Sequence, residues 1–503
     1  CIIGDLGNGD AYLTIKYNSS GNTVWTQKYD LGASPTYGYA IAVDPVNNVY
    51  VTGRKFGSVS WDYFTIKYNS SGNTVWTQQY KGANADEAYG IAADASQHVY
   101  ITGFKHNGLN RDYFTIVYDI SGNTVRTMQY NSGNNEWARA ITLDPSGNIY
   151  VTGVKDNGAN NDFFTIKYDN SGNTLWTQQY NGGNADEARA IAVDSSFNIY
   201  VTGQKNNGAD LDYYTIKYDS SGNTIWTQQF DSGDVDEVHG IAVDSYGNSY
   251  VTGGKNAASF NIFTIKYDSD GNTVWTQEFD GQSGIDGGFG ITVDDEHYVY
   301  VTGVKTSGNN DLFTIKYLQP PYPCSLLSVL SKAEDAAELI WQDVPNEEFY
   351  LIYRSLNGAT FEPIATAGKN ITNYIDTGLE PLTEYYYRIV TTNQAGKSVP
   401  SNILQAQTLS ITSLEEVTVG PNPFRPNTDG IEYVTFFNLP AEFEMNIYSI
   451  TGAKVAHVNT QTYNGQYQWD ARSSENKVLS SGVYMCHIKA RGKEKLLKLI
   501  IIR

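Results

Sequence analysis

Residues 62–80 read DYFTIKYNSSGNTVWTQQY, and this stretch decides the fold. Two runs rich in β-branched and aromatic residues, TIKY and TVWTQQY, flank a segment of Asn, Ser and Gly. This pattern is typical of a β-hairpin with a tight turn. The TIKY segment returns at a period of about fifty residues, so the hairpin belongs to a tandem repeat. Its copies lie at 14–17, 65–68, 165–168, 215–218, 264–267 and 314–317, with TIVY at 115–118.

Each period contains two further strand-like runs, as in YGIAADASQHVYITG at 89–103. Four short strands per repeat are typical of one blade of a β-propeller. With the AIAVD strand innermost, the order within a blade is AIAVD, YVTG, TIKY and the tryptophan-bearing strand. The first unit then lacks its inner strand, and the last unit, residues 289–317, lacks its outer strand. An all-β, seven-bladed propeller is predicted, with a six-bladed ring as the alternative.

Residues 1–17 align with the interior of a repeat. This alignment predicts that further residues precede Cys1 and supply the missing outer strand, which would remove the free sheet edges. A lipoprotein that begins with an acylated Cys1 is the alternative.

Composition excludes several classes of protein. A chain of 503 residues implies two to four domains. Its formal charge of −20 and the lack of a basic face in the repeats argue against a nucleic-acid partner. The three cysteines lie in or beside different modules, so no disulfide framework is predicted. No run of eighteen apolar residues occurs, and no membrane span is predicted.

The composition changes after LQPPYP at 318–323, which is predicted to be a stiff linker. Residues 324–408, with AELIWQD, FYLIYRS and LEPLTEYYYRIVTTNQAG, resemble a fibronectin type III sandwich. The resemblance implies that Trp341 fills the core and that Tyr385 is the corner tyrosine that bonds back to the chain.

A second linker, 409–416, precedes a last module at 417–503. This module, with VGPNPFRP, MNIYSITGAKV and SSGVYMCHIK, is similar to the immunoglobulin-like C-terminal domains of type IX secretion substrates and flagellar hook-capping proteins. The resemblance implies export and a role in sorting or attachment. The basic tail from Lys489 onward is read both as part of this signal and as the last strand of the sandwich.

Through the motifs quoted above, residues 1–317 resemble the bacterial seven-bladed β-propeller repeats. The resemblance implies an extracellular or cell-surface propeller, usually without a known catalytic activity.

No catalytic constellation is found in the sequence. The six histidines are scattered without HExxH spacing, and no GxSxG elbow, phosphate loop or CxxC pair occurs. No cofactor or metal is predicted. The acid pairs at 86–87, 186–187 and 236–237 are expected to cap turns or pair with basic side chains, with a metal as the alternative. Core packing is predicted for the tryptophans of the outer strands, a series that Arg126 breaks: Trp25, Trp76, Trp176, Trp226 and Trp275.

The repeats differ from one another mainly in the loops after YVTG and before AIAVD, which emerge on one face of a blade. At the start of the innermost strand, successive units carry Tyr39, Tyr89, Arg139, Arg189, His239 and Phe289. Two residues earlier they carry Tyr37, Glu87, Trp137, Glu187, Glu237 and Gly287. Aromatic rings can stack on sugars and arginines can bind carboxylates, so this face is the predicted binding site. Drift without selection is the alternative.

Together these features predict a non-enzymatic, secreted cell-surface protein. Its propeller would bind a glycan or protein ligand in adhesion, and its C-terminal module would serve export or attachment. One alternative is a structural subunit that self-associates into a filament or sheath. A polysaccharide-active enzyme that uses His239, Arg189 and Tyr89 is another.

Overall fold

The computed structural model describes residues 2–503 except 6–10, 19, 31–33, 257–259, 281–285, 307–309, 334, 381–382, 410–413, 427–431, 441, 462–464 and 491. The chain divides into two compact units, residues 1–318 and 319–503. Across the described residues, every regular element is a β-strand apart from one 3-10 turn, η1 (Leu414–Glu416). The prediction of an all-β protein with propeller repeats and sandwich sheets is therefore confirmed.

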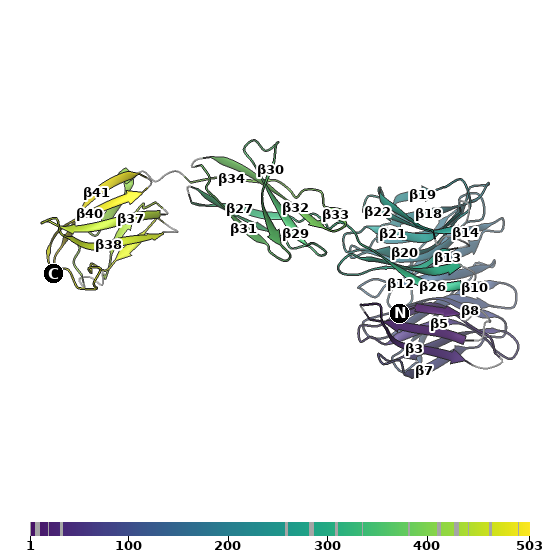
Figure 1. The fold of residues 1–503 in the computed structure, drawn as a ribbon. Helices are drawn as coiled ribbons and strands as arrows, with labels where there is room; N and C mark the ends of the chain where they lie inside the picture. Colours follow the sequence, from purple (N-terminus) through teal and green to yellow (C-terminus); the bar gives the residue numbers. More distant parts are fainter. Residues whose placement is uncertain are drawn as a thin grey trace. The chain divides into compact units, whose positions relative to one another are not determined.

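The first unit contains seven sheets that follow one another along the chain (Figure 1). The first and last have three described strands each: β1 (Ile2–Asp5), β2 (Ala11–Tyr17) and β3 (Thr23–Asp30), then β24 (Gly287–Val293), β25 (Val299–Thr306) and β26 (Asn310–Tyr317). The five sheets between them have four strands each: β4 (Thr36–Val43), β5 (Val49–Phe56), β6 (Trp61–Tyr68) and β7 (Thr74–Tyr80); β8 (Asp86–Ala93), β9 (Val99–His106), β10 (Arg111–Tyr118) and β11 (Thr124–Tyr130); β12 (Glu136–Leu143), β13 (Ile149–Asp156), β14 (Asn161–Tyr168) and β15 (Thr174–Tyr180); β16 (Glu187–Val193), β17 (Ile199–Asn206), β18 (Leu211–Tyr218) and β19 (Thr224–Phe230); β20 (Asp236–Val243), β21 (Ser249–Asn256), β22 (Phe260–Tyr267) and β23 (Thr273–Phe279).

The strands of each sheet pair antiparallel in chain order, as predicted. Consecutive sheets contact each other through their first strands, β4 with β8, β8 with β12 and so on to β20 with β24. The number of blades in the closed ring stays a prediction.

The turns that join the first two strands of a sheet follow one pattern. Asp44 accepts hydrogen bonds from the backbone amides of Val46 and Asn48 and from the Tyr50 hydroxyl, 2.8–3.1 Å away. Asp144 and Asp194 repeat these contacts. These side-chain bonds add to the backbone bonds of the same turns, and an Asx turn needs Asp or Asn at its first position, which accounts for the recurring Asp.

Polar contacts also join neighbouring sheets. The Tyr63 hydroxyl donates to the Phe114 carbonyl at 3.0 Å, and the Tyr113 hydroxyl donates to the Phe164 carbonyl at 2.9 Å. On the outer strand, the Trp76 indole donates to the Ile120 carbonyl of the next sheet at 3.1 Å. Arg126 donates to the equivalent carbonyl, that of Asn170, so it keeps the contact although it breaks the tryptophan series. The tryptophans therefore join the sheets, as the packing interpretation predicted.

The second unit contains four sheets. In residues 326–407 these are β27 (Leu326–Ala333), β28 (Ala336–Trp341) and β31 (Asn373–Thr377), and, in the other sheet, β29 (Phe349–Ser355), β30 (Glu362–Gly368), β32 (Glu384–Asn393), β33 (Gly396–Lys397) and β34 (Leu404–Gln407). In residues 418–501 these are β35 (Thr418–Gly420), β36 (Val434–Phe437) and β39 (Tyr467–Trp469), and β37 (Glu442–Ser449), β38 (Lys454–Gln461), β40 (Gly482–Ala490) and β41 (Lys493–Ile501).

Trp341 is 1% exposed in the first of these cores, and the Tyr385 hydroxyl accepts a hydrogen bond from the Glu380 amide at 3.0 Å. The burial of Trp341 and the hydrogen bond of Tyr385 were both predicted.

The 318–323 segment has no strand, as expected, but it is hydrogen-bonded to the residues that follow it. The Thr391 hydroxyl donates to the Tyr322 carbonyl at 2.6 Å, and the Asn346 side chain donates to the Gln319 carbonyl at 2.9 Å. The exact module boundaries stay a prediction.

The C-terminal tail forms β41, which pairs along its length with β40. Leu499 and Ile501 of this strand are buried in the module's core. Helices long and apolar enough to cross a membrane are absent from the described chain.

Candidate ligand-binding surface

The six residues predicted at the start of the innermost strands share one backbone feature. The β4 to β5 ladder skips a residue between Gly38 and Ala40, so Tyr39 is the extra residue of a β-bulge. The same skip occurs in the five following sheets. A bulge re-aims the side chain of its extra residue. We call these six extra residues the bulge arc: Tyr39, Tyr89, Arg139, Arg189, His239 and Phe289.

A glycine of the YVTG strand stands opposite each bulge. A Cβ atom on Gly103 would lie 1.9 Å from the Glu87 carbonyl oxygen, and one on Gly203 would lie 2.1 Å from the Glu187 carbonyl oxygen. Only glycine allows the bulged strand to come this close. In the sequence analysis this glycine was only part of a strand motif. Its recurrence in six units could have indicated that the neighbouring strand passes close to it.

Members of the bulge arc from neighbouring sheets contact one another. The Tyr39 and Tyr89 rings have centroids 5.3 Å apart, the Arg139 guanidinium lies 4.8 Å from the Tyr89 centroid, and the His239 and Phe289 rings are 4.8 Å apart. Tyr39 and Phe289 expose 38% and 55% of their surface, so the arc offers accessible aromatic faces at both ends.

Arg139, Glu187 and Arg189 form the centre of the arc. The Glu187 carboxylate lies 2.8 Å from Arg189 and 3.7 Å from Arg139. Arg189 also donates to the Gln204 side chain at 2.9 Å. Burial lowers the pKa of Arg189, and the positive charge of Arg139 lowers it further, while Glu187 opposes both effects.

Arg54 belongs to this surface although sequence reasoning did not select it. Its guanidinium lies 2.9 Å from the Glu87 carboxylate and 4.3 Å from the Trp61 ring centroid. Glu87 also accepts a hydrogen bond from the Tyr89 hydroxyl at 2.8 Å. Arg54 and Glu87 lie on neighbouring sheets, so their spacing in sequence could not reveal the pair.

Two further members of the predicted set lie beside the arc. The Trp137 ring centroid lies 5.9 Å from the Arg111 guanidinium and 6.0 Å from that of Arg139. Tyr37 lies 4.8 Å from the Arg54 guanidinium. Aromatic and guanidinium groups therefore alternate along this surface.

His239 lies 3.8 Å from Glu237. Burial, followed by the positive charge of Arg189, lowers the pKa of His239 to about 4. The imidazole is therefore neutral at pH 7. Tyr89 contacts Arg139, and His239 contacts Phe289. Arg189 acts electrostatically on His239, and Tyr89 acts on Arg189.

The acid pairs divide their contacts. Asp86 accepts backbone hydrogen bonds from Gly82 and His106, whereas Glu87 pairs with Arg54. Asp186 and Glu187 follow the same division. In these two pairs the first acid caps a turn and the second pairs with an arginine, as the sequence analysis expected.

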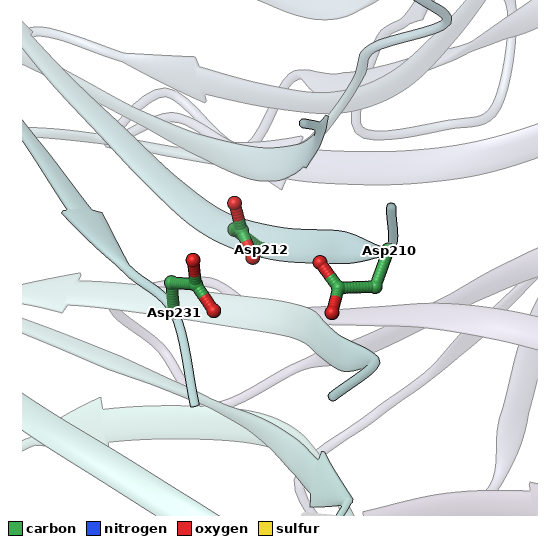
Figure 2. A group of neighbouring side chains, drawn as sticks. All are labelled: Asp210, Asp212 and Asp231. Atoms are coloured by element: carbon green, nitrogen blue, oxygen red, sulfur yellow. The ribbon is translucent and has the colours of Figure 1, made fainter. Parts of the chain in front are cut away.

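Three other carboxylates, Asp210, Asp212 and Asp231, face one another within 4.8 Å (Figure 2). Asp212 is fully buried, and its pKa is raised first by burial, with further contributions from the charges of Asp231 and Asp210. Two sister sheets carry Asn at the two outer positions: Asn110 and Asn131 around Asp112, and Asn160 and Asn181 around Asp162. The acids alone do not make a metal site, and none is assigned here.

We predict that the double change Asp210→Asn and Asp231→Asn stabilises the propeller by about 1 kcal/mol, because it removes like charges around a buried carboxylate. The amides can keep the existing acceptor contacts, since Asn131 already accepts from the Gly133 amide as Asp231 does from the Gly233 amide. Thermal unfolding at pH 7 with a chelator present checks this. A lower midpoint for the double variant would contradict it.

Two family descriptions match parts of the chain. "Beta-propeller repeat" matches residues 25–54, 175–212 and 225–254. "Secretion system C-terminal sorting domain" matches residues 418–503. The chain carries β-propeller repeats and a type IX secretion sorting domain. The sorting domain makes this a secreted or cell-surface protein of the type IX secretion system, as predicted.

Solved structures similar to this propeller and sorting-domain protein include PorZ, a bacterial surface component of the type-IX secretion system of Porphyromonas gingivalis. PorZ is 13% identical with a TM-score of 0.28, over 100% of this chain and 75% of its own. The gluconolactonase XC5397 from Xanthomonas campestris is 15% identical with a TM-score of 0.34, over 53% of this chain and 83% of its own.

The sixth fibronectin type III domain from human fibronectin type III domain containing protein 3 is 20% identical with a TM-score of 0.17, over 18% of this chain and 87% of its own. At these TM-scores none of the three structures indicates what this protein does. The search of curated proteins gave no match.

Proposed function

We propose that this secreted protein is a non-enzymatic binding protein of the cell surface, and that the bulge arc is its ligand-binding surface. One observation supports the proposal: in six consecutive sheets, the extra residue of a β-bulge is a residue that varies from repeat to repeat. The two sandwich modules then serve as spacer and as sorting or attachment module, and the ligand is a glycan or a protein.

The contacts of the arc favour binding over catalysis. His239 is neutral at pH 7, and Glu87 and Glu187 are paired with arginines. Groups held in ion pairs and stacks are preorganised to recognise a ligand. A general acid or base works best with a pKa near the working pH, and the pKa of His239, about 4, lies well below pH 7.

The test is a panel of immobilised glycans and peptides, probed with the intact chain. We expect at least one ligand to bind the parent protein and to bind the double variant Tyr39→Ala, Tyr89→Ala at least about tenfold more weakly, since two stacked rings are lost. Tyr246→Ala is the matched control, because Tyr246 is 44% exposed in a turn of the opposite face. Equal binding by parent and double variant would overturn the proposal.

A second candidate function, a subunit of a polymeric filament or sheath, is supported by β26. Among the described strands it pairs only with β25. Leu312 of β26 is 43% exposed, whereas Tyr63, at the same place in β6, is 1% exposed. Such an edge strand can pair with residues that precede Cys1, as the repeat alignment predicts, or with another chain. Electron microscopy of the native protein with mass analysis separates the candidates: ordered polymers favour the subunit, and discrete monomers favour the binding protein.

A further inference from the structure

The arginines of the propeller are concentrated at the bulge arc. Residues 1–317 contain five arginines, and four of them (Arg54, Arg111, Arg139 and Arg189) lie in or beside the arc. The fifth, Arg126, lies on the outer strand β11. In a chain with a formal charge of −20, these arginines lie among the carboxylates Glu87, Glu187 and Glu237.

The arginines of the arc differ in how well they are neutralised. Arg54 has a carboxylate partner of its own, Glu87, at 2.9 Å. Arg139 and Arg189 share one carboxylate, Glu187, which lies within hydrogen-bond distance of Arg189 but 3.7 Å from Arg139. In the part of the chain that the structure describes, the Arg139 guanidinium makes no hydrogen bond, and its Nε is buried without an acceptor, as are those of Arg54 and Arg189.

A partly buried guanidinium without an acceptor is costly, and an added carboxylate would relieve that cost. Arginine presents a planar fork of donors that matches a carboxylate in a two-hydrogen-bond geometry. Burial is the main cause that lowers the pKa of Arg189, and the charge of Arg139 adds to it, while Glu187 and Glu237 oppose it. Arg139, whose carboxylate partner Glu187 lies 3.7 Å away, is therefore the group of the arc that an added carboxylate would serve.

Accessible aromatic faces lie on both sides of the centre of the arc. On one side, Tyr39 contacts Tyr89, which contacts Arg139. On the other side, Phe289 contacts His239. A pyranose ring offers an apolar face for such rings, and a uronic acid adds one carboxylate to each sugar. An acidic peptide would use the arginines but leave these flat aromatic faces unmatched.

We propose that the arc binds an acidic polysaccharide, with a uronate carboxylate held by Arg139 and Arg189 and neighbouring sugar rings packed on Tyr39 and Phe289. This inference rests on the proposed function of the arc as a binding surface, and it adds the chemical class of the ligand.

The experiment is calorimetric titration of the intact chain with oligogalacturonate and, separately, with the same oligosaccharide fully methyl-esterified. The two probes share their sugar rings and differ in the carboxylate. We expect the free acid to bind at least about tenfold more tightly than the ester, as a charge-assisted pair is worth roughly 1.4 kcal/mol or more. Arg139→Gln and Arg189→Gln are each expected to remove most of this preference.

Arg126→Gln is the matched control, because it removes the same charge from the outer strand. It should leave the preference for the acid unchanged, whereas non-specific attraction would weaken equally in all three variants. Thermal unfolding of each variant verifies that it is folded. Arg139 and Arg189 are substituted separately, so that if one variant misfolds, the other still tests the preference for the acid.

Three results would overturn the inference. Equal affinity for acid and ester, with loss of both in the Tyr39→Ala, Tyr89→Ala variant, would leave the binding function standing but remove the carboxylate from it. Tighter binding of poly-glutamate than of oligogalacturonate would identify an acidic peptide instead. If neither oligosaccharide bound while a neutral glycan of the panel did, the ligand would be a neutral glycan. If the protein bound no glycan or peptide of the panel, the proposed function itself would be contradicted.

Discussion

The substitution Gly103→Ala is expected to destabilise the propeller by about 3 kcal/mol, because the added methyl group cannot fit opposite the bulge. Its carbon would lie 1.9 Å from the Glu87 carbonyl oxygen, 2.8 Å from the Tyr63 hydroxyl and 2.9 Å from the Ala88 Cα. Two of these atoms belong to the backbone, so β8 must move or the bulge must be lost. Calorimetry of the intact chain should show the propeller transition about 6 °C lower, at roughly 2 °C per kcal/mol for a unit of this size.

The control for this change is Gly240→Ala in the same unit. Three sister sheets already have alanine there, at Ala40, Ala140 and Ala190. Its Cβ would lie no closer than 3.2 Å to any neighbour. We expect a shift of less than about 1 kcal/mol for this variant. If Gly103→Ala shifted the transition no more than Gly240→Ala does, close approach of the bulged strand would not be the reason for the glycine.

The substitution Tyr113→Ala is expected to cost about 4 kcal/mol, since it removes a fully buried ring from between two sheets. Tyr113 is 1% exposed, and its ring packs edge-on against Phe164 at 5.8 Å. Its hydroxyl donates to the Phe164 carbonyl at 2.9 Å, and that carbonyl would also lose this partner. The same calorimetric transition measures the loss.

The matched variant is Tyr113→Phe, which keeps the ring and removes only the hydroxyl. The chain itself has phenylalanine at the equivalent position of the next sheet, where Phe163 is 1% exposed and packs edge-on against Tyr214. We expect a cost of about 1 kcal/mol, typical of one lost hydrogen bond. Equal losses for the two variants would mean that the hydroxyl, and not the ring, holds the sheets together.

Most of the fold could be predicted because the repeat supplies several signals at once. Alternating apolar strands, SGN turns and the recurring TIKY segment all favour the same four-stranded sheet. The arc residues could be selected for a related reason: equivalent positions in successive repeats occupy equivalent places, so Tyr39, Tyr89 and Arg139 had to lie on neighbouring sheets.

What could not be predicted depends on backbone detail and on contacts between repeats. A bulge adds one residue to a strand, and the apolar pattern of YGIAAD does not show it. The Arg54 to Glu87 pair joins strands β5 and β8 of two neighbouring sheets, 33 residues apart in the chain. The contact of Arg126 with the next sheet could not be predicted, because an arginine and a tryptophan differ in chemistry. Arg126 nevertheless donates to the same carbonyl position as Trp76 does.

The central claim is that the bulge arc is the ligand-binding surface. The most direct measurement is amide hydrogen exchange of the intact chain with and without the strongest ligand of the panel, resolved by peptides. We predict protection at the starts of β4, β8, β12, β16, β20 and β24, where the arc lies. Protection confined to the opposite-face turns at 94–98, 144–148 and 194–198, or to the sandwich modules, would contradict the account.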